Sequence, residues 1–189
     1  ITGGTLDTNS SSNYALTVAG SAQMYDGGTL TCNASTVSLG STYSADYGLN
    51  VRDGATFNGG TGAHTMGSIS VANESGAVLV LTTHASGTTL NAGDYGGNAL
   101  IAVGASSGIT STNSLVVVAT SVSESPSGFH LNLHDHFNDL TINSSGKTFS
   151  LAQASTLAGD LTITAGTLVG GSVNHSFGSL TIASGGTYS

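Results

Sequence analysis

The chain has 189 residues and a net charge of −8, with two Lys and Arg residues against ten Asp and Glu. Two basic side chains cannot neutralise a run of phosphates, so nucleic-acid binding is excluded, and an anionic membrane surface is disfavoured for the same reason. Charged residues make up only 6% of the sequence and hydrophobic residues 38%. Much of the hydrophobic share is Val, Ile and Leu in strict alternation with polar residues, which indicates folded β-structure rather than disorder. No apolar run is long enough to span a bilayer, so we expect no membrane insertion.

One short phrase recurs along the chain. It consists of an apolar residue, a small polar residue, a β-branched residue, a turn that contains Gly in most copies, and a second short strand. Alternation places the first and third residues on one face of a strand, and Gly permits the positive φ that a tight corner often needs. The clearest copies begin at Leu16, Leu49, Ile69, Leu140, Leu161 and Leu180.

The spacing of these copies predicts the fold class. The interval from Leu49 to Ile69 is nearly the same as the intervals from Leu140 to Leu161 and from Leu161 to Leu180. A period of about 20 residues is typical of a solenoid. We therefore predict an all-β protein, a parallel β-helix (β-solenoid) that is right-handed by default and has about nine coils of roughly 20 residues. In it, Leu140, Leu161 and Leu180 form one buried column, and Ile142, Ile163 and Ile182 form another.

The prediction treats residues 1–189 as a single solenoid segment with a less regular stretch at 90–128. Within that stretch "ALIAVG" and "SLVVVATSV" are strand candidates, and "SESPSG", which holds the only Pro, predicts a protruding loop. The sequence starts and stops in the middle of a phrase, so we expect it to be a fragment of a longer chain. Open solenoid ends are exposed sheet edges, which predicts self-association as a trimer or a filament.

The runs at residues 4–40 and 137–168 resemble the Gly/Thr/Asn-rich β-solenoid repeats of phage tail fibres, viral appendages and large secreted bacterial surface proteins. The resemblance covers about two thirds of the chain and is specific to a style of repeat. It implies a structural shaft or an adhesive module, located on a virion, at a cell surface or outside the cell, and often trimeric in phage proteins.

A histidine-rich stretch, "FHLNLHDHFND", provides one candidate metal site. Alternation places Leu131, Leu133 and Phe137 inward, and it places His134 and His136 together on the outer face, about 6 to 7 Å apart. One such pair cannot close a metal site, but three pairs around a threefold axis supply six nitrogens. The resemblance to phage fibres and spikes implies iron, although imidazole suits other transition metals equally. The alternative is a solvated, histidine-rich strand edge.

The remaining candidate residues have simpler structural interpretations. His64 and His175 precede a turn in their repeats and are expected to form hydrogen bonds at coil corners. Cys32 shares the parity of Leu30, which predicts a small buried thiol. Neither prediction implies a cofactor.

A pair of carboxylates raises the alternative of a glycan-processing enzyme. Asp139 and Asp160 occupy the same repeat position, so stacking places them about 5 Å apart, a separation that resembles the pair of a retaining glycosidase. Ser68 and Ser179 occupy this position in other copies, which favours a turn-capping role shared by Asp and Ser. We therefore expect no catalytic residues and no enzyme activity.

Outward threonines suggest one more alternative. Thr17, Thr141, Thr162 and Thr181 form a column in the predicted stack, with Asn50 and Ser70 at the equivalent positions of other copies. Flat Thr arrays on β-solenoids can bind ice, although Thr is also a common exposed strand residue. The sequence thus favours a structural shaft or adhesive segment of a phage fibre or a similar appendage, with a cell-surface glycan as a candidate partner. The alternatives are a bacterial secreted adhesin module, a glycan-processing enzyme and an ice-binding module.

Overall fold

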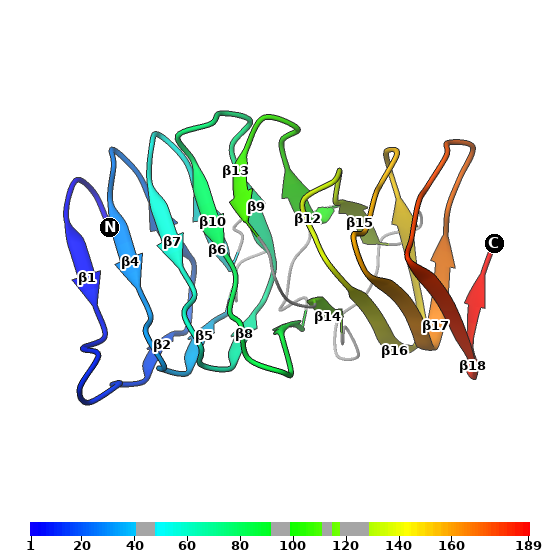
Figure 1. The fold of residues 1–189 in the computed structure, drawn as a ribbon, viewed down its shortest axis with the longest axis horizontal. Coiled ribbons are helices and arrows are strands. Elements are labelled where there is room, and N and C mark those ends of the chain that lie inside the picture. The colour runs from blue at the N-terminus through cyan, green and yellow to red at the C-terminus, as the bar shows by residue number, and fades with distance from the viewer. Residues whose placement is uncertain (41–47, 92–98, 111–114, 118–128) are drawn as a thin grey trace.

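The computed structural model describes residues 1–40, 48–91, 99–110, 115–117 and 129–189, and these residues form strands and turns but no helix. The strands stack along a rod with the two termini at opposite ends (Figure 1). Every strand pairing in the described residues is parallel. The all-β prediction is confirmed, and the arrangement is consistent with a parallel β-solenoid. The part of the chain that is described has no helix of the length and apolar character needed to cross a membrane.

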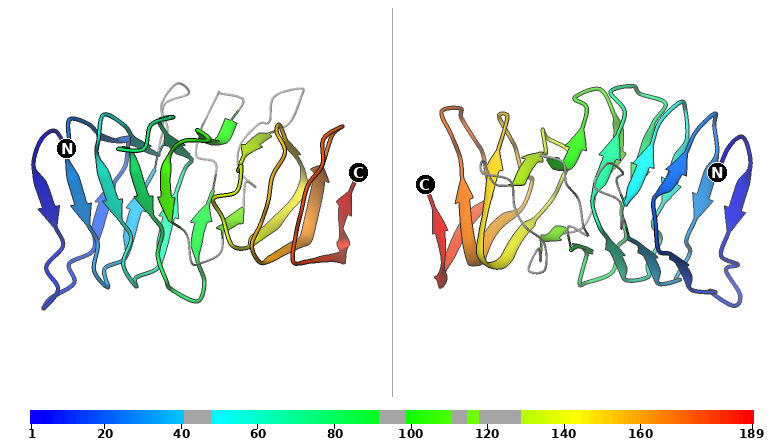
Figure 2. Two further views of the ribbon diagram at one scale, coloured as in Figure 1. Left: turned by 45° about the horizontal axis from the view of Figure 1, so that its top comes forward. Right: turned by 180° about the vertical axis from the view of Figure 1, so that it is seen from behind.

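Three ladders of strands run along the rod, and the chain visits them in turn (Figures 1 and 2). The first ladder contains β2 (Leu16–Val18), β5 (Val37–Leu39), β8 (His64–Met66), β11 (Thr88–Leu90), β14 (Leu115–Val117) and the first halves of β16 (Leu140–Leu151), β17 (Asp160–Val169) and β18 (Ser179–Tyr188). The second contains β3 (Ala22–Met24), β6 (Leu49–Val51), β9 (Ile69–Val71), β12 (Ala99–Val103), β15 (Phe129–Asn132) and the second halves of β16, β17 and β18. The third contains β1 (Thr5–Asp7), β4 (Thr29–Thr31), β7 (Thr56–Asn58), β10 (Val78–Val80) and β13 (Gly108–Thr110).

The hydrophobic core consists of columns of side chains from successive coils. Leu140 pairs with Leu161 and Leu161 with Leu180, while Ile142 pairs with Ile163 and Ile163 with Ile182. Both predicted columns therefore exist, but Leu180 and Ile182 at the last coil are each 45% exposed rather than buried. Leu140, Ile142, Leu161 and Ile163 are at most 1% exposed, because a coil covers them on each side along the rod. In the second ladder Phe129 stacks on Phe149 with ring centroids 5.4 Å apart.

The number of residues per coil varies more than the sequence predicted. In the first ladder, few residues separate Leu161 from its partner Leu180 in the sequence, whereas clearly more separate Val37 from its partner His64. The reason is that the connecting turns differ in length. As a result, copies that look alike in sequence do not all belong to one ladder. Leu49 and Ile69 pair with each other, as predicted, but they lie in the second ladder rather than in the first.

The stretch predicted to be less regular, 90–128, is described only in part. Its "ALIAVG" run forms β12, and the first ladder passes through β14 within "SLVVVATSV". The "SESPSG" segment with Pro126 lies outside the described residues.

Candidate functional site

The outer face of the first ladder carries a row of mostly hydroxyl-bearing side chains, which Val116 interrupts. The row is formed by the middle residue of each strand, which points outward as Thr141 does between the core residues Leu140 and Ile142. We call these eight middle residues the hydroxyl row, and they are Thr17, Ser38, Thr65, Thr89, Val116, Thr141, Thr162 and Thr181. Seven of the eight carry a hydroxyl group, and neighbouring members are about 4.8 Å apart because they lie on paired strands.

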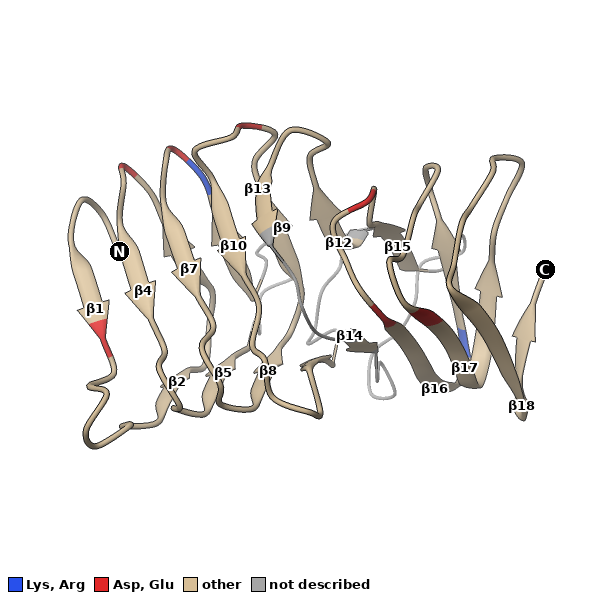
Figure 3. Ribbon diagram, in the orientation of Figure 1, with Lys and Arg blue, Asp and Glu red and all other residues tan. Residues whose placement is uncertain are grey.

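No charged side chain belongs to the hydroxyl row. Most of the described acidic and basic residues lie at turns and strand ends, and Lys147 lies within β16 beyond the half that belongs to this ladder, so the described strands of the first ladder are uncharged over most of their length (Figure 3). Asp139 and Asp160 come close to the row in sequence, one residue before the inward-facing Leu140 and Leu161. Positions next to the row are mostly small, for example Ala15, Ala63 and Gly67. The row itself is therefore uncharged, regular in one direction and made of small side chains.

The sequence predicted only part of this row. Thr17, Thr141, Thr162 and Thr181 are in it, as expected. Asn50 and Ser70 are not, because they point outward from the second ladder, where Asn50 donates a 3.0 Å hydrogen bond to Gln23. The members that sequence reasoning missed are Ser38, Thr65, Thr89 and Val116.

The predicted metal ligands His134 and His136 do not lie on a strand. β15 ends at Asn132, and His134 sits in the following turn with a left-handed φ of 52°. The two ring centroids are 6.1 Å apart and tilted by 58°, so the separation is as expected although the extended pairing is wrong. The described residues contain no group of three or more His, Cys, Asp or Glu side chains that could hold a metal ion. A site shared by three chains stays a prediction.

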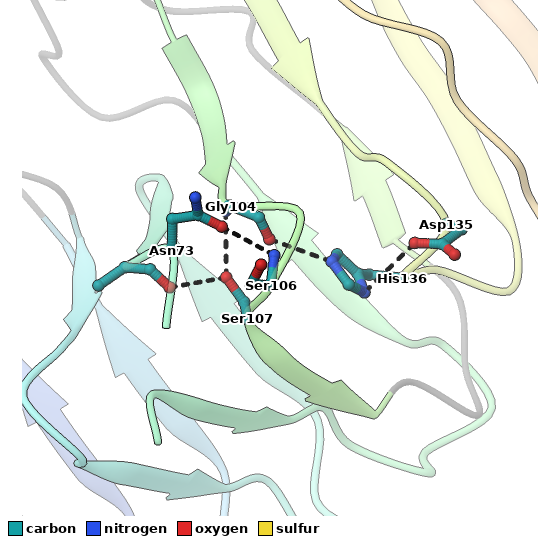
Figure 4. A network of polar contacts seen from close by, with 7 residues as sticks. Asn73, Gly104, Ser106, Ser107, Asp135 and His136 are labelled. Carbon is teal, nitrogen blue, oxygen red and sulfur yellow. Dashed lines mark hydrogen bonds and ion pairs between the residues drawn. The ribbon is translucent and has the colours of Figure 1, made fainter. Parts of the chain in front are cut away.

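His136 is engaged within its own chain. Its Nε2–H donates a 3.1 Å hydrogen bond to the carbonyl oxygen of Gly104, and its Nδ1 lies 3.7 Å from a carboxylate oxygen of Asp135 (Figure 4). Ser107 stabilises the turn at Gly104. Its Oγ accepts a hydrogen bond from the Gly104 N–H and donates one to the carbonyl oxygen of Ala72. This contact leaves Nδ1 as the nitrogen of His136 that a metal could use.

Two other histidines form the coil-corner hydrogen bonds that were expected. The Nε2–H of His64 donates to the carbonyl of Gly59 at 2.7 Å, and that of His175 donates to the carbonyl of Gly170 at 2.6 Å. In both cases the acceptor lies a few positions earlier in the chain. Burial lowers the pKa of His64 below its usual 6.5.

The carboxylate of Asp139 forms hydrogen bonds to a neighbouring coil and to the adjacent residue. Asp139 Oδ1 accepts a 2.7 Å hydrogen bond from the backbone N–H of Asp160 on the next coil, and Oδ2 accepts one of 3.0 Å from the side chain of Asn138. Ser179 is the residue paired with Asp160. The contacts of Asp139 agree with the turn-capping interpretation.

Cys32 is fully buried, as its parity predicted. Desolvation raises the pKa of its thiol to about 12, so it stays protonated at neutral pH and does not provide a nucleophile or a metal-binding thiolate.

The geometry therefore offers one extended surface, the hydroxyl row, and the described residues of a single chain contain no cluster of three or more metal-ligating side chains. No family model, curated protein or solved structure matches the chain.

Proposed function

We propose that this chain is a shaft segment of a surface appendage, a β-solenoid that holds other parts of the appendage at a distance. One observation carries the proposal: strands from the N-terminal end to the C-terminal end pair in parallel, in a single ladder that runs in constant register from β2 to β18. Stability in such a stack comes from contacts between neighbouring coils, so length is gained simply by adding coils.

The surface chemistry supports a mechanical role outside the cell or on a virion. Hydroxyl and amide groups on the surface can form hydrogen bonds with sugars, so a cell-surface glycan is the partner proposed for an adhesive version of the segment. The right-handed sense of the coils and a total near nine stay predictions.

A coil insertion tests the shaft proposal. A second copy of residues 140–160, placed directly after the first, supplies one additional coil with its own inward Leu and Ile. Small-angle X-ray scattering should show a rod whose length grows by about 4.8 Å while its cross-section stays constant. An increase in cross-section without added length would contradict the shaft function. Binding of the same rods to an array of neutral glycans tests adhesion separately.

A second candidate function, ice binding, is favoured by the length of the hydroxyl row. The row has twice as many members as the four threonines that the sequence identified. It combines hydroxyl and methyl groups at a constant spacing, and none of its members is charged. An ordered water lattice is a periodic, uncharged partner of that kind. The row holds no aromatic side chain on which a sugar ring could stack, which favours ice over a glycan at this face.

Paired Lys substitutions test this second candidate. Thr65→Lys with Thr89→Lys places two long charged side chains on adjacent strands of the row. Thr29→Lys with Thr56→Lys does the same on adjacent strands of the third ladder. Ice binding predicts thermal hysteresis in the wild type and the control, and its loss in the row variant alone. Absence of hysteresis in the wild type would remove this candidate.

A further inference from the structure

One column of the first ladder changes from apolar to polar on two neighbouring coils. The residues in register with Leu140 along this ladder are Leu16, Val37, His64, Thr88, Leu115, Leu140, Leu161 and Leu180. Only His64 and Thr88 are polar among them, and they are paired directly between β8 and β11. His64 is 2% exposed and Thr88 is 0% exposed, so the solvent around the rod does not reach either side chain.

Each of these two side chains has one polar atom without a hydrogen-bond partner among the described residues, Nδ1 of His64 and Oγ1 of Thr88. The Nε2 atom of His64 lies 2.7 Å from the carbonyl oxygen of Gly59. Because a carbonyl oxygen only accepts, Nε2 carries the hydrogen of the neutral ring and Nδ1 keeps a lone pair. Burial lowers the pKa of His64, which also favours the neutral ring. The interior therefore holds an acceptor and a hydroxyl group that form no hydrogen bond with the rest of the chain.

Leaving the two atoms unpaired is costly, because each gives up its hydrogen bonds to water when the chain folds. The core side chains next to them in register are Val37, Met66 and Leu90, and the ring of Phe57 meets that of His64 edge-on. None of these side chains can donate a hydrogen bond to Nδ1. The missing partner must therefore be small and uncharged, and it must both donate to a nitrogen and bond to a hydroxyl group.

We propose that one water molecule is enclosed between these coils, where it bridges Nδ1 of His64 and Oγ1 of Thr88. The water donates a hydrogen to Nδ1 and accepts the hydrogen of the Thr88 hydroxyl, so both atoms gain a partner. Paired strands are about 4.8 Å apart, which brings the two side chains into adjacent layers of the core. This internal binding site does not depend on the proposed shaft function.

The size and the ligands of the site both favour water. Thr88 has one side-chain heavy atom fewer than the Leu in the same column on other coils, such as Leu140, and a water molecule adds one heavy atom. A metal ion fits less well, because one imidazole nitrogen and one hydroxyl are fewer ligands than the four of a structural zinc site. The described residues also contain no group of three or more His, Cys, Asp or Glu that could complete such a site.

The test counts long-lived internal water molecules by magnetic relaxation dispersion of the solvent. Thr88→Val keeps the shape of the side chain and removes its hydroxyl, so the number of internal waters should fall by one relative to the wild type. Thr56→Val removes an outward hydroxyl from β7 and is the matched control, which should keep the wild-type number. Circular dichroism and the melting temperature check that both variants are folded.

A crystal structure of the wild type, at a resolution that shows ordered water, gives a second measurement that needs no variant. It should show one water oxygen within hydrogen-bond distance of both Nδ1 of His64 and Oγ1 of Thr88. A Thr88 hydroxyl that donates directly to Nδ1 would overturn the proposal, as would an unchanged number of internal waters in Thr88→Val. An equal fall in the Thr56→Val control would also overturn it, because the lost water would then not belong to this site.

Discussion

The imidazole of His64 lies inside the stack, where its Nε2–H donates a 2.7 Å hydrogen bond to the carbonyl oxygen of Gly59. The residue is 2% exposed, and its ring meets the ring of Phe57 edge-on at 5.9 Å. It occupies an inward position of the first ladder that Val37 fills on the preceding coil. Burial is the largest cause of its lowered pKa, and the nearby His84 acts in the same direction.

We expect this histidine to make the stack sensitive to mild acid. Its pKa is lower in the folded chain than the usual 6.5, so the unfolded chain binds the proton more readily. The free energy of unfolding should therefore be highest above pH 6.5 and fall as the pH drops below it, with a slope of at most about 1.4 kcal/mol per pH unit for one group. Urea unfolding between pH 7.5 and 5 measures this slope.

His64→Gln is the informative variant, because an amide can still donate to Gly59 but does not titrate. Its stability should change less with pH than that of the wild type over the same range. Identical slopes in the two proteins would assign the acid sensitivity to other groups.

Asp139 fastens one coil to the next through the backbone N–H of Asp160. We expect Asp139→Ala to lower the free energy of unfolding by about 1 to 2 kcal/mol, because the amide and the Asn138 side chain lose their acceptor. Asp139→Ser should recover part of this loss. Asp160→Ala, at an exposed position, is the matched control and should stay within about 0.5 kcal/mol of the wild type. Equal losses at Asp139 and Asp160 would contradict the capping role.

Alternation correctly predicted most of the buried residues, although Leu180 and Ile182, which it also placed inside, are each 45% exposed. Leu131, Leu133 and Phe137 are all at most 2% exposed, and Cys32 is buried as the parity of Leu30 requires. The reason is physical: successive strand residues must point to opposite faces, so parity is a local property of the sequence. The pairing of Leu140 with Leu161 and Leu180 was predictable because the turns between them are of similar length.

Two features depended on information that parity does not contain. Thr65 and Thr89 belong to the hydroxyl row because more residues separate successive strands of the first ladder on these coils than near the C-terminus. No short-range sequence pattern predicts how many residues a coil contains. The outward placement of His134 failed for another reason. The prediction assumed that the strand continues past Asn132, but the strand ends there. The backbone at His134 then has a left-handed conformation, which few residues other than Gly adopt.

Metal binding by His134 and His136 is expected only where three chains associate. Within one chain the pair is too few, and Nε2 of His136 already donates to Gly104. Elemental analysis of size-separated fractions should therefore find iron or another transition metal at one per three chains in a trimer, and none in monomers. His134→Ala should abolish this metal, whereas His130→Ala, whose ring bonds to Ser150, should retain it. Stoichiometric metal in monomers, or a trimer without metal, would contradict the site.

Substitutions at Gly60 and Gly27 distinguish two contributions to the loss of stability. One is the cost of an unusual backbone conformation, and the other is the cost of disturbing the close stacking between coils. Both glycines have positive φ, +65° and +73°, but a Cβ on Gly27 meets nothing within 4 Å, whereas one on Gly60 runs into the carbonyl oxygen of Asn33 on the preceding coil. The same oxygen accepts a 2.6 Å hydrogen bond from the N–H of Thr61.

We therefore expect Gly27→Ala to destabilise the fold by about 1 to 2 kcal/mol, the cost of a left-handed Ala. Gly60→Ala carries the same conformational cost and also forces two coils apart, so its loss should be larger by at least about 2 kcal/mol, since a buried contact and a hydrogen bond are disturbed together. Thermal and urea unfolding of the two variants measure the difference. Similar losses of stability in the two variants would mean that the turn at Gly60 can shift without disturbing the preceding coil. A large excess at Gly60 would show that stability in this chain depends on how closely each coil fits the one before it.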